Sequence, residues 1–104
     1  MGKIKWTEKA ESHLHAIHDY IAQDSLFYAT RFISSLIRAT RKLEMFPFCG
    51  RYVPELPGYN FREVIYKNYR IVYRIIEEEN IEVLAVIHSA REMQNVLREE
   101  WNIE

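Results

Sequence analysis

The chain has 104 residues, 48% of them hydrophobic, so it is large enough for one compact domain with its own core, and a second domain would not fit. Its 14 lysines and arginines nearly balance 15 aspartates and glutamates, which excludes a global field that attracts nucleic acid. The single cysteine, Cys49, excludes an internal disulfide and a four-cysteine metal site. No apolar run approaches the ~20 residues that span a bilayer, and the N-terminus has no apolar signal region, so we expect a cytoplasmic protein.

The N-terminal part of the chain predicts a short strand followed by two helices. Residues 3–6 alternate polar and apolar side chains, which indicates an edge strand. Thr7 then offers an N-cap, and apolar residues at helical spacing predict a first helix that ends at about Gln23. A second cap at Asp24-Ser25 opens a second apolar stripe, which Pro47 ends. Because the link between the helices is short, we expect an antiparallel helical hairpin.

The next segment predicts a loop and then three strands. Residues 49–60 contain two glycines and two prolines, so we expect a loop with a brief strand at residues 51–53. Three runs rich in Val, Ile and Tyr follow between residues 61 and 88. The turn-like pairs Lys67-Asn68 and Glu79-Asn80 separate them, which is typical of adjacent antiparallel strands.

The last of these strands and the C-terminus complete the predicted fold. Between residues 81 and 87, all residues except Glu82 are apolar and fall on both faces, so we expect a central strand whose second face is covered by the last helix or by a partner polypeptide. Ser89 and Glu92 have capping-box spacing, which predicts a helix from Ala90 through Trp101. The elements predict one α+β domain over residues 1–104: a short N-terminal strand, a two-helix hairpin packed on an antiparallel sheet, and a C-terminal helix.

Two trios of strand residues bring arginines onto an otherwise apolar sheet. The first trio is Arg62, Val64 and Tyr66, and the second is Arg70, Val72 and Arg74. Each trio shares one face, and the strand register decides whether the two faces coincide. Arginines on one face with tyrosines nearby could grip phosphates and stack a base. Alternatively the arginines pair across the sheet with carboxylates, the possible partners being Glu55, Glu63, Glu77 and Glu82.

His88 and Arg91 lie at the end of the central strand and at the start of the last helix, where both could approach Arg70. Such a cluster could carry out acid–base chemistry on RNA, since a histidine titrates near neutral pH and arginines stabilise a phosphorane. In the alternative interpretation, His88 is hydrogen-bonded and closes the turn between strand and helix.

The histidines of the first helix do not indicate a metal site. His13 and His15 diverge by about 200° around a helix, so they cannot share one ion. His15 and His18 are neighbours, but no Asp, Glu or Cys is obviously placed to complete a coordination shell. We therefore expect neither a metal nor another cofactor.

Six short segments between residue 3 and about residue 93 form an ordered pattern. They are Trp6-Thr7-Glu8-Lys9-Ala10, Tyr20-Ile21, Phe46-Pro47 with Gly50-Arg51, Arg62-Glu63, Tyr69-Arg70-Ile71-Val72-Tyr73 and Val86-Ile87-His88-Ser89-Ala90-Arg91. Their order and spacing resemble the toxins of bacterial type II toxin–antitoxin modules, the RelE/ParE superfamily of plasmid stabilisation proteins, and are closer to the ParE branch. The resemblance implies a cognate antitoxin as partner.

The resemblance implies one of two functions. RelE-like toxins are ribosome-dependent mRNA endonucleases, whereas ParE-like toxins inhibit DNA gyrase by binding it. For a nuclease, the catalytic candidates are Arg70, which matches the arginine on the scissile phosphate, Glu55, which resembles a base, and His88 and Arg91. However, Ala90 and Arg91 stand where some of these nucleases have a His-Tyr pair, so the catalytic set is incomplete.

The gyrase-directed function is the one we favour from the sequence. A formal charge of −1 fits poorly with a ligand of the phosphate-rich ribosome and mRNA, but a protein target makes no such demand. The helical hairpin and the C-terminal tail offer amphipathic surface for a protein partner. The residues expected to bind the target are Arg62, Arg70, Arg74, Arg91 and Trp101.

Overall fold

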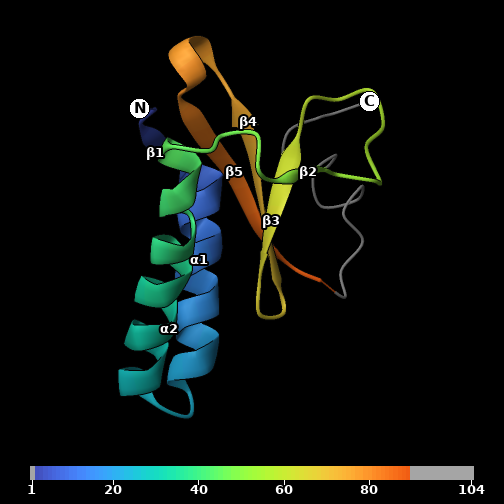
Figure 1. Cartoon of the computed structure of the whole chain (residues 1–104). Coiled ribbons are helices and arrows are strands. Elements are labelled where there is room, and N and C mark those ends of the chain that lie inside the picture. Colours follow the sequence, from blue (N-terminus) through green and yellow to red (C-terminus); the bar gives the residue numbers. More distant parts are fainter. Residues whose placement is uncertain (1, 90–104) are drawn as a thin grey trace.

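The computed structural model describes residues 2–89, which form two helices packed on one face of a five-stranded sheet (Figure 1). The helices are α1 (Glu8–Ala22) and α2 (Leu26–Ala39). The strands are β1 (Ile4–Trp6), β2 (Arg51–Tyr52), β3 (Arg62–Tyr66), β4 (Tyr69–Ile75) and β5 (Ile81–His88), with short 3₁₀ turns η1 (Arg41–Glu44) and η2 (Glu77–Glu79). The α+β class and the helical hairpin are confirmed.

Both helices begin where their capping residues predict. The Thr7 hydroxyl accepts the Ala10 N–H, and the Ser25 hydroxyl accepts the Tyr28 N–H, each at 3.1 Å. These side chains satisfy N–H groups that the first turn of a helix leaves without a partner. α2 ends at Ala39, earlier than Pro47, and the 3₁₀ turn η1 then carries the fully buried Leu43 into the core.

The strand order is β1-β5-β4-β3-β2, and β3, β4 and β5 form the predicted antiparallel meander. β1 is an edge strand, as expected, but it pairs with β5 in parallel, so the sheet is mixed rather than purely antiparallel. β1 can lie there because the chain runs through the helical hairpin and the meander before β5 returns beside it. No sequence pattern of residues 3–6 distinguishes the two directions.

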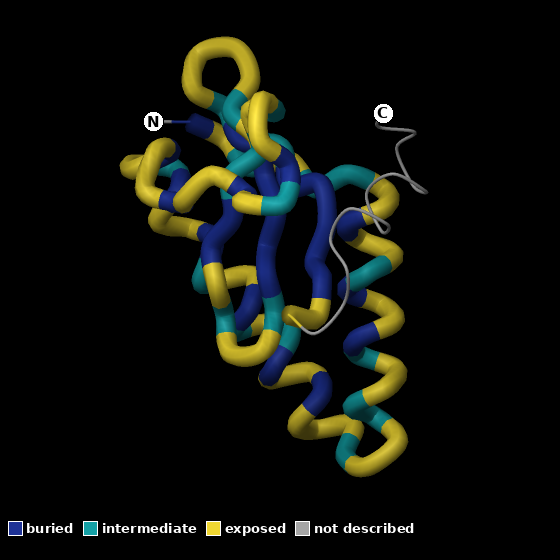
Figure 2. The backbone as a smooth tube through the Cα atoms, turned by 90° about the vertical axis from the view of Figure 1, so that its right-hand side faces the viewer, coloured by how far each residue is buried: buried dark blue, intermediate teal, exposed yellow. Residues whose placement is uncertain are grey.

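β5 is covered on both faces, as its apolar residues on both faces predict (Figure 2). Ile81, Val83 and Val86 pack in the cluster under the helices. On the second face, Leu84, Ala85 and Ile87 contact a separate cluster formed with the loop between β2 and β3. A register shift opposite Val72 and Tyr73 makes Leu84 an extra residue in β5, so that two successive side chains turn to this second face.

The face of β5 that points away from the helices is covered differently from what the sequence predicts. Val53 and Leu56 of the loop are buried there, and Tyr59 and Phe61 pack against them. The loop therefore supplies cover that the sequence assigned to the last helix or to a partner, because its apolar residues are spaced among prolines and show no regular period. The predicted helix from Ala90 through Trp101 lies outside the described residues. Within residues 2–89, no helix is long and apolar enough to cross a membrane.

Candidate functional site

The strand register places the two arginine trios on opposite faces of the sheet. Arg62 pairs with Tyr73 and therefore shares the face of the helices, whereas Arg70 pairs with Ile65 and shares the face of the β2–β3 loop. The two arginines accordingly do not form one cationic surface.

Arg70 is held between two carboxylates. Its Nε donates to Glu63 Oε1, and its Nη1 and Nη2 donate to the two oxygens of Glu55, all at 2.7 Å. The last pair is a bidentate contact, the strongest geometry available to a guanidinium and a carboxylate. Arg70 is 6% exposed, and the Glu63 side chain is fully buried. Arg70 thus joins β3, β4 and the loop from the inside.

A second arginine, whose side chain is mostly exposed, joins this network at Glu63. Arg51 Nε donates to the other oxygen of Glu63 at 2.7 Å, so Glu63 bridges Arg51 and Arg70. The hydrogen bonds from Arg70 hold the pKa of the Glu55 carboxyl below its ordinary value. The hydrogen bonds to Glu55, followed by those to Glu63, raise the pKa of the Arg70 guanidinium, although burial opposes this. Both partners are therefore charged at neutral pH and bound to each other.

Carboxylate pairing also accounts for Arg74, whose Nε donates to Glu82 Oε1 across β4 and β5 at 2.7 Å. Pairing across the sheet was the alternative to phosphate binding, and the structure has it at Arg70 and at Arg74. Three of the four carboxylates that the sequence offered as partners pair with these arginines, namely Glu55, Glu63 and Glu82.

Arg62 has a different environment. Its guanidinium carbon lies 4.2 Å from the centre of the Tyr52 ring and 5.3 Å from that of Phe48. Its Nη1 donates to the carbonyl oxygens of Gly50 at 2.7 Å and Phe48 at 3.2 Å. Cation–π contacts and backbone acceptors therefore position this arginine, which remains partly exposed.

His88 is exposed and does not approach Arg70 across the sheet. It pairs with Tyr69, and the two rings meet edge to face with centres 5.4 Å apart. Tyr69 also contacts Phe32 of α2, so this pair belongs to the helix-covered face, opposite to the side chain of Arg70. Burial raises the pKa of the Tyr69 hydroxyl. Alternation along β4 thus separates His88 from Arg70, while Arg91 and Trp101 lie outside the described residues.

The loop before β2 is anchored by Tyr73. Its hydroxyl donates to the Pro47 carbonyl at 2.7 Å and accepts the Gly50 N–H at 3.0 Å. Burial raises the pKa of this hydroxyl. A Cβ at Gly50 would lie 2.5 Å from the Tyr73 oxygen and 2.7 Å from the Glu63 carbonyl oxygen, so a glycine is needed for this close approach. The anchor helps to position Phe48 and Tyr52, whose rings contact Arg62.

The α1 histidines make individual contacts. His13 Nδ1 accepts the Val86 N–H at 3.1 Å, and His18 Nε2 lies 3.4 Å from the Thr30 hydroxyl. Among residues 2–89 there is no group of three His, Cys, Asp or Glu side chains that could hold a metal ion.

Sequence reasoning missed the environment of Arg62 and the apolar surface beside it. Met45, Phe46 and Phe48 are all more than half exposed, although they are large and apolar. The available signal was three such residues within four positions of a loop, directly before Gly50-Arg51. Such a stretch lacks the strand or helix periodicity that would bury its side chains, and this lack could have predicted their exposure.

Comparison with known proteins agrees with this architecture. The sequence model described as the ParE toxin of the type II toxin–antitoxin system parDE matches residues 4–93. The chain belongs to the ParE toxin family. It is accordingly a toxin of a type II toxin–antitoxin system of the ParE/RelE superfamily, as the resemblance predicted. No curated protein matches the sequence.

Solved structures share the fold of this ParE family member. The chromosomal ParDE toxin–antitoxin system of P. aeruginosa is similar with a TM-score of 0.70 and 23% identity, covering 85% of this chain and 96% of that one. The RelBE2 toxin–antitoxin complex of Mycobacterium tuberculosis is similar with a TM-score of 0.62 and 20% identity, covering 84% and 96%. At this level of identity, the two similarities support the fold.

Proposed function

We propose that this ParE family toxin acts in the cytoplasm by binding DNA gyrase and inhibiting it, and that a cognate antitoxin neutralises it. The alternative is a ribosome-dependent endonuclease like the RelE branch. The two functions make different demands on Arg70, Glu55 and His88, because only the nuclease needs these groups free for phosphate binding and proton transfer.

The state of Arg70 is the observation that carries the proposal. A phosphate-binding arginine must offer its N–H groups to the substrate, but three of the five N–H groups of Arg70 are donated to Glu55 and Glu63. A substrate phosphate would have to displace a bidentate carboxylate from a side chain that is 6% exposed. The same contact occupies both oxygens of Glu55, the residue that a nuclease would use as base.

The position of His88 supports the same conclusion. General acid–base catalysis requires the proton-transferring group and the phosphate-binding group within reach of one substrate atom. His88 and Arg70 project to opposite faces of the sheet, with Tyr69 beside His88. A single phosphodiester cannot contact both side chains while β4 and β5 remain paired.

The partners are part of the proposal. The structures with TM-scores of 0.70 and 0.62 come from a ParDE system and a RelBE2 toxin–antitoxin complex, which supports an antitoxin for this chain. The match to the ParE family model favours gyrase over the ribosome as the target. The near-neutral charge of the chain also fits a protein target better than a phosphate-rich one.

The experiment separates the two functions directly. Purified toxin, freed of antitoxin, is added to gyrase with relaxed plasmid and, separately, to ribosomes translating a defined mRNA. We expect loss of supercoiling, or gyrase trapped on cleaved DNA, while the mRNA stays intact. Cleavage of ribosome-bound mRNA with gyrase unaffected would overturn the proposal.

A His88→Ala variant refines this test. Loss of a general acid–base group typically lowers a rate about 100-fold to 10,000-fold. If the toxin acts by contact with gyrase, the folded variant keeps most of its inhibition, because no proton transfer is lost. A folded His88→Ala protein without toxicity would favour the nuclease.

A further inference from the structure

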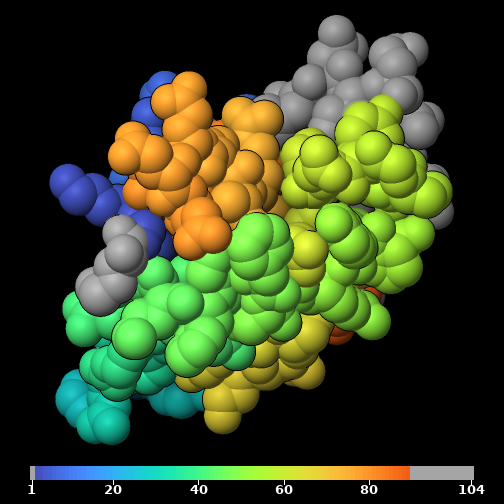
Figure 3. All heavy atoms as spheres, turned by 45° about the horizontal axis from the view of Figure 1, so that its top comes forward, coloured from blue at the N-terminus to red at the C-terminus, as the bar shows by residue number. Residues whose placement is uncertain are grey.

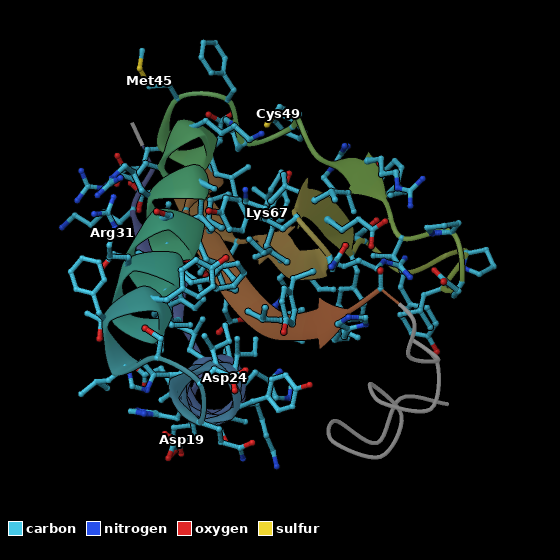
Figure 4. All side chains as sticks on the ribbon, turned by 90° about the horizontal axis from the view of Figure 1, so that it is seen from below. Asp19, Asp24, Arg31, Met45, Cys49 and Lys67 are labelled. Carbon is cyan, nitrogen blue, oxygen red and sulfur yellow. The ribbon has the colours of Figure 1, made fainter. Side chains whose placement is uncertain are left out.

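The segment before and within β2 exposes an unusual amount of apolar surface. The exposed fractions are 65% for Met45, 62% for Phe46, 58% for Phe48 and 58% for Tyr52. We call these four residues together with Arg62 the basic aromatic patch. In Figure 3 the segment lies on the face turned to the viewer, beside the turn between β4 and β5, and in Figure 4 Met45 points away from the protein body. Contiguous exposed apolar surface of this kind marks interaction sites.

A hollow gives the patch a shape that a side chain can fill. It has a volume of about 390 Å³ and is lined by residues 45–49 and by Glu79. Phe48 belongs both to this hollow and to the aromatic pair around Arg62, so the two features adjoin. The lining is mostly apolar, as in sites that receive a side chain of a protein partner.

Arg62 differs from the paired arginines of the sheet. Arg51, Arg70 and Arg74 each have a carboxylate at 2.7 Å, but no carboxylate within residues 2–89 pairs with Arg62. Its Nη1 is used by two backbone carbonyls, and the two rings hold the guanidinium in place. A fixed guanidinium without a carboxylate is prepared to pair with an acidic group of a partner.

The charge that the patch offers to a partner is that of Arg62, because Arg51 is already paired with Glu63. Glu79 lines the hollow, so the hollow suits an apolar side chain of a partner and Arg62 suits its carboxylate.

The chemistry of the patch favours a polypeptide over a nucleic acid. The rings of Phe48 and Tyr52 already have a face covered by Arg62, which reduces their use for stacking a base. An apolar hollow beside a guanidinium that no carboxylate of residues 2–89 pairs with instead suits a peptide with an apolar and an acidic side chain.

We propose that the basic aromatic patch is the docking site of an acidic, apolar segment of the antitoxin, which places a carboxylate on Arg62 and an apolar side chain in the hollow. The antitoxin is the better occupant than gyrase because a permanent partner covers more apolar surface than a transient one. The inference rests on the toxin–antitoxin part of the proposed function and does not depend on gyrase being the target.

The test measures the affinity of purified toxin variants for the purified product of the antitoxin gene beside the toxin gene, by calorimetry at two salt concentrations. Arg62→Gln should weaken binding at least about tenfold and reduce its salt dependence, because it removes a charged contact at a pre-formed site. A Met45→Ser, Phe46→Ser double variant should also weaken binding at least about tenfold. This second variant leaves the backbone contacts of Arg62 in place, so it decides the matter if Arg62→Gln disturbs the loop.

Arg31→Gln is the matched control, because Arg31 lies 5.5 Å from the ring centre of the exposed Phe27 on α2, outside the patch. It should keep parental affinity. Unchanged affinity in both patch variants would overturn the proposal, and so would an equal loss in Arg31→Gln, which would show a general charge effect. Patch variants that bind antitoxin normally but no longer inhibit gyrase, or no longer bind single-stranded RNA, would assign the patch to those partners instead. If the parental toxin has no effect on gyrase, the proposed target is wrong. The affinities of the variants for the antitoxin still test the docking site in that case.

Discussion

At the scale of single residues, Arg70 shows how the same side chain can serve structure or catalysis according to its neighbours. Glu63 pairs with it from β3, and Glu55 pairs with it from the loop, at 2.7 Å each. Removing a hydrogen-bonding partner from a buried group typically costs about 1–3 kcal/mol, and more when a buried charge keeps no partner. The network therefore makes Arg70 a structural residue in this toxin.

We predict that Arg70→Leu lowers the free energy of unfolding by about 1–3 kcal/mol, because the buried Glu63 loses one of its two cationic partners and keeps only Arg51. The measurement is urea denaturation followed by circular dichroism. The double variant Arg70→Leu, Glu63→Leu should recover much of this loss, since no buried carboxylate oxygen is then left without its donor. A stable Arg70→Leu protein that had lost only toxicity would indicate a functional role for Arg70.

Glu55 makes the stability of the folded protein depend on pH. Its pKa is lowered in the folded protein from an ordinary value of 4.5, mainly by the hydrogen bonds from Arg70. The unfolded chain therefore binds more protons below pH 4.5, so this stabilisation is complete above that pH and is lost as the pH falls toward the folded pKa. Urea denaturation between pH 7 and pH 3 should give a shallower acid-side decline for Glu55→Gln than for the parent. Parallel curves would mean that Arg70 does not hold this carboxylate in solution.

At the scale of elements, local signals fixed much of the fold in advance. Thr7 and Ser25 predict the helix starts, and the turn pairs predict the meander, because capping and turn chemistry depend on neighbouring residues. The direction of β1 and the register between β3 and β4 depend on contacts between distant segments. For that reason the sequence left open whether Arg62 and Arg70 share a face. The cover of β5 by the loop was missed for the same reason, as its apolar residues have no period.

The hydrogen bonds between Tyr73 and the loop before β2 depend on the small size of Gly50. We expect Gly50→Ala to destabilise the protein by about 1–3 kcal/mol, because the added carbon would meet the Tyr73 ring and the Glu63 carbonyl. Adding Tyr73→Phe should not rescue it, since the carbonyl and a ring carbon, each 2.7 Å from the Cβ position, remain. Thermal unfolding of the two variants measures this. Full recovery in the double variant would locate the clash at the hydroxyl alone.

At the scale of the whole molecule, apolar surface is exposed at two separate places. One is the basic aromatic patch, and the other is the tip of the helical hairpin, where Tyr20, Leu26 and Phe27 are 71%, 65% and 72% exposed. Figure 1 shows the hairpin tip at the far end of α1 and α2 from the chain that leads into β2. Two apolar surfaces on separate sides let one molecule bridge two others, which favours open-ended association over a closed dimer.

The free toxin should therefore self-associate as its concentration rises, and co-expression with the antitoxin should increase its soluble yield. Sedimentation velocity over a concentration series would report the association. Replacing Met45 and Phe46 with serine, or Leu26 and Phe27 with serine, should each limit association to smaller species, because either change leaves only one apolar surface per molecule. Combining both pairs should give a monomer, with circular dichroism as the control for folding. A parent chain that sediments as a monomer throughout, with a yield indifferent to the antitoxin, would show that neither surface needs cover.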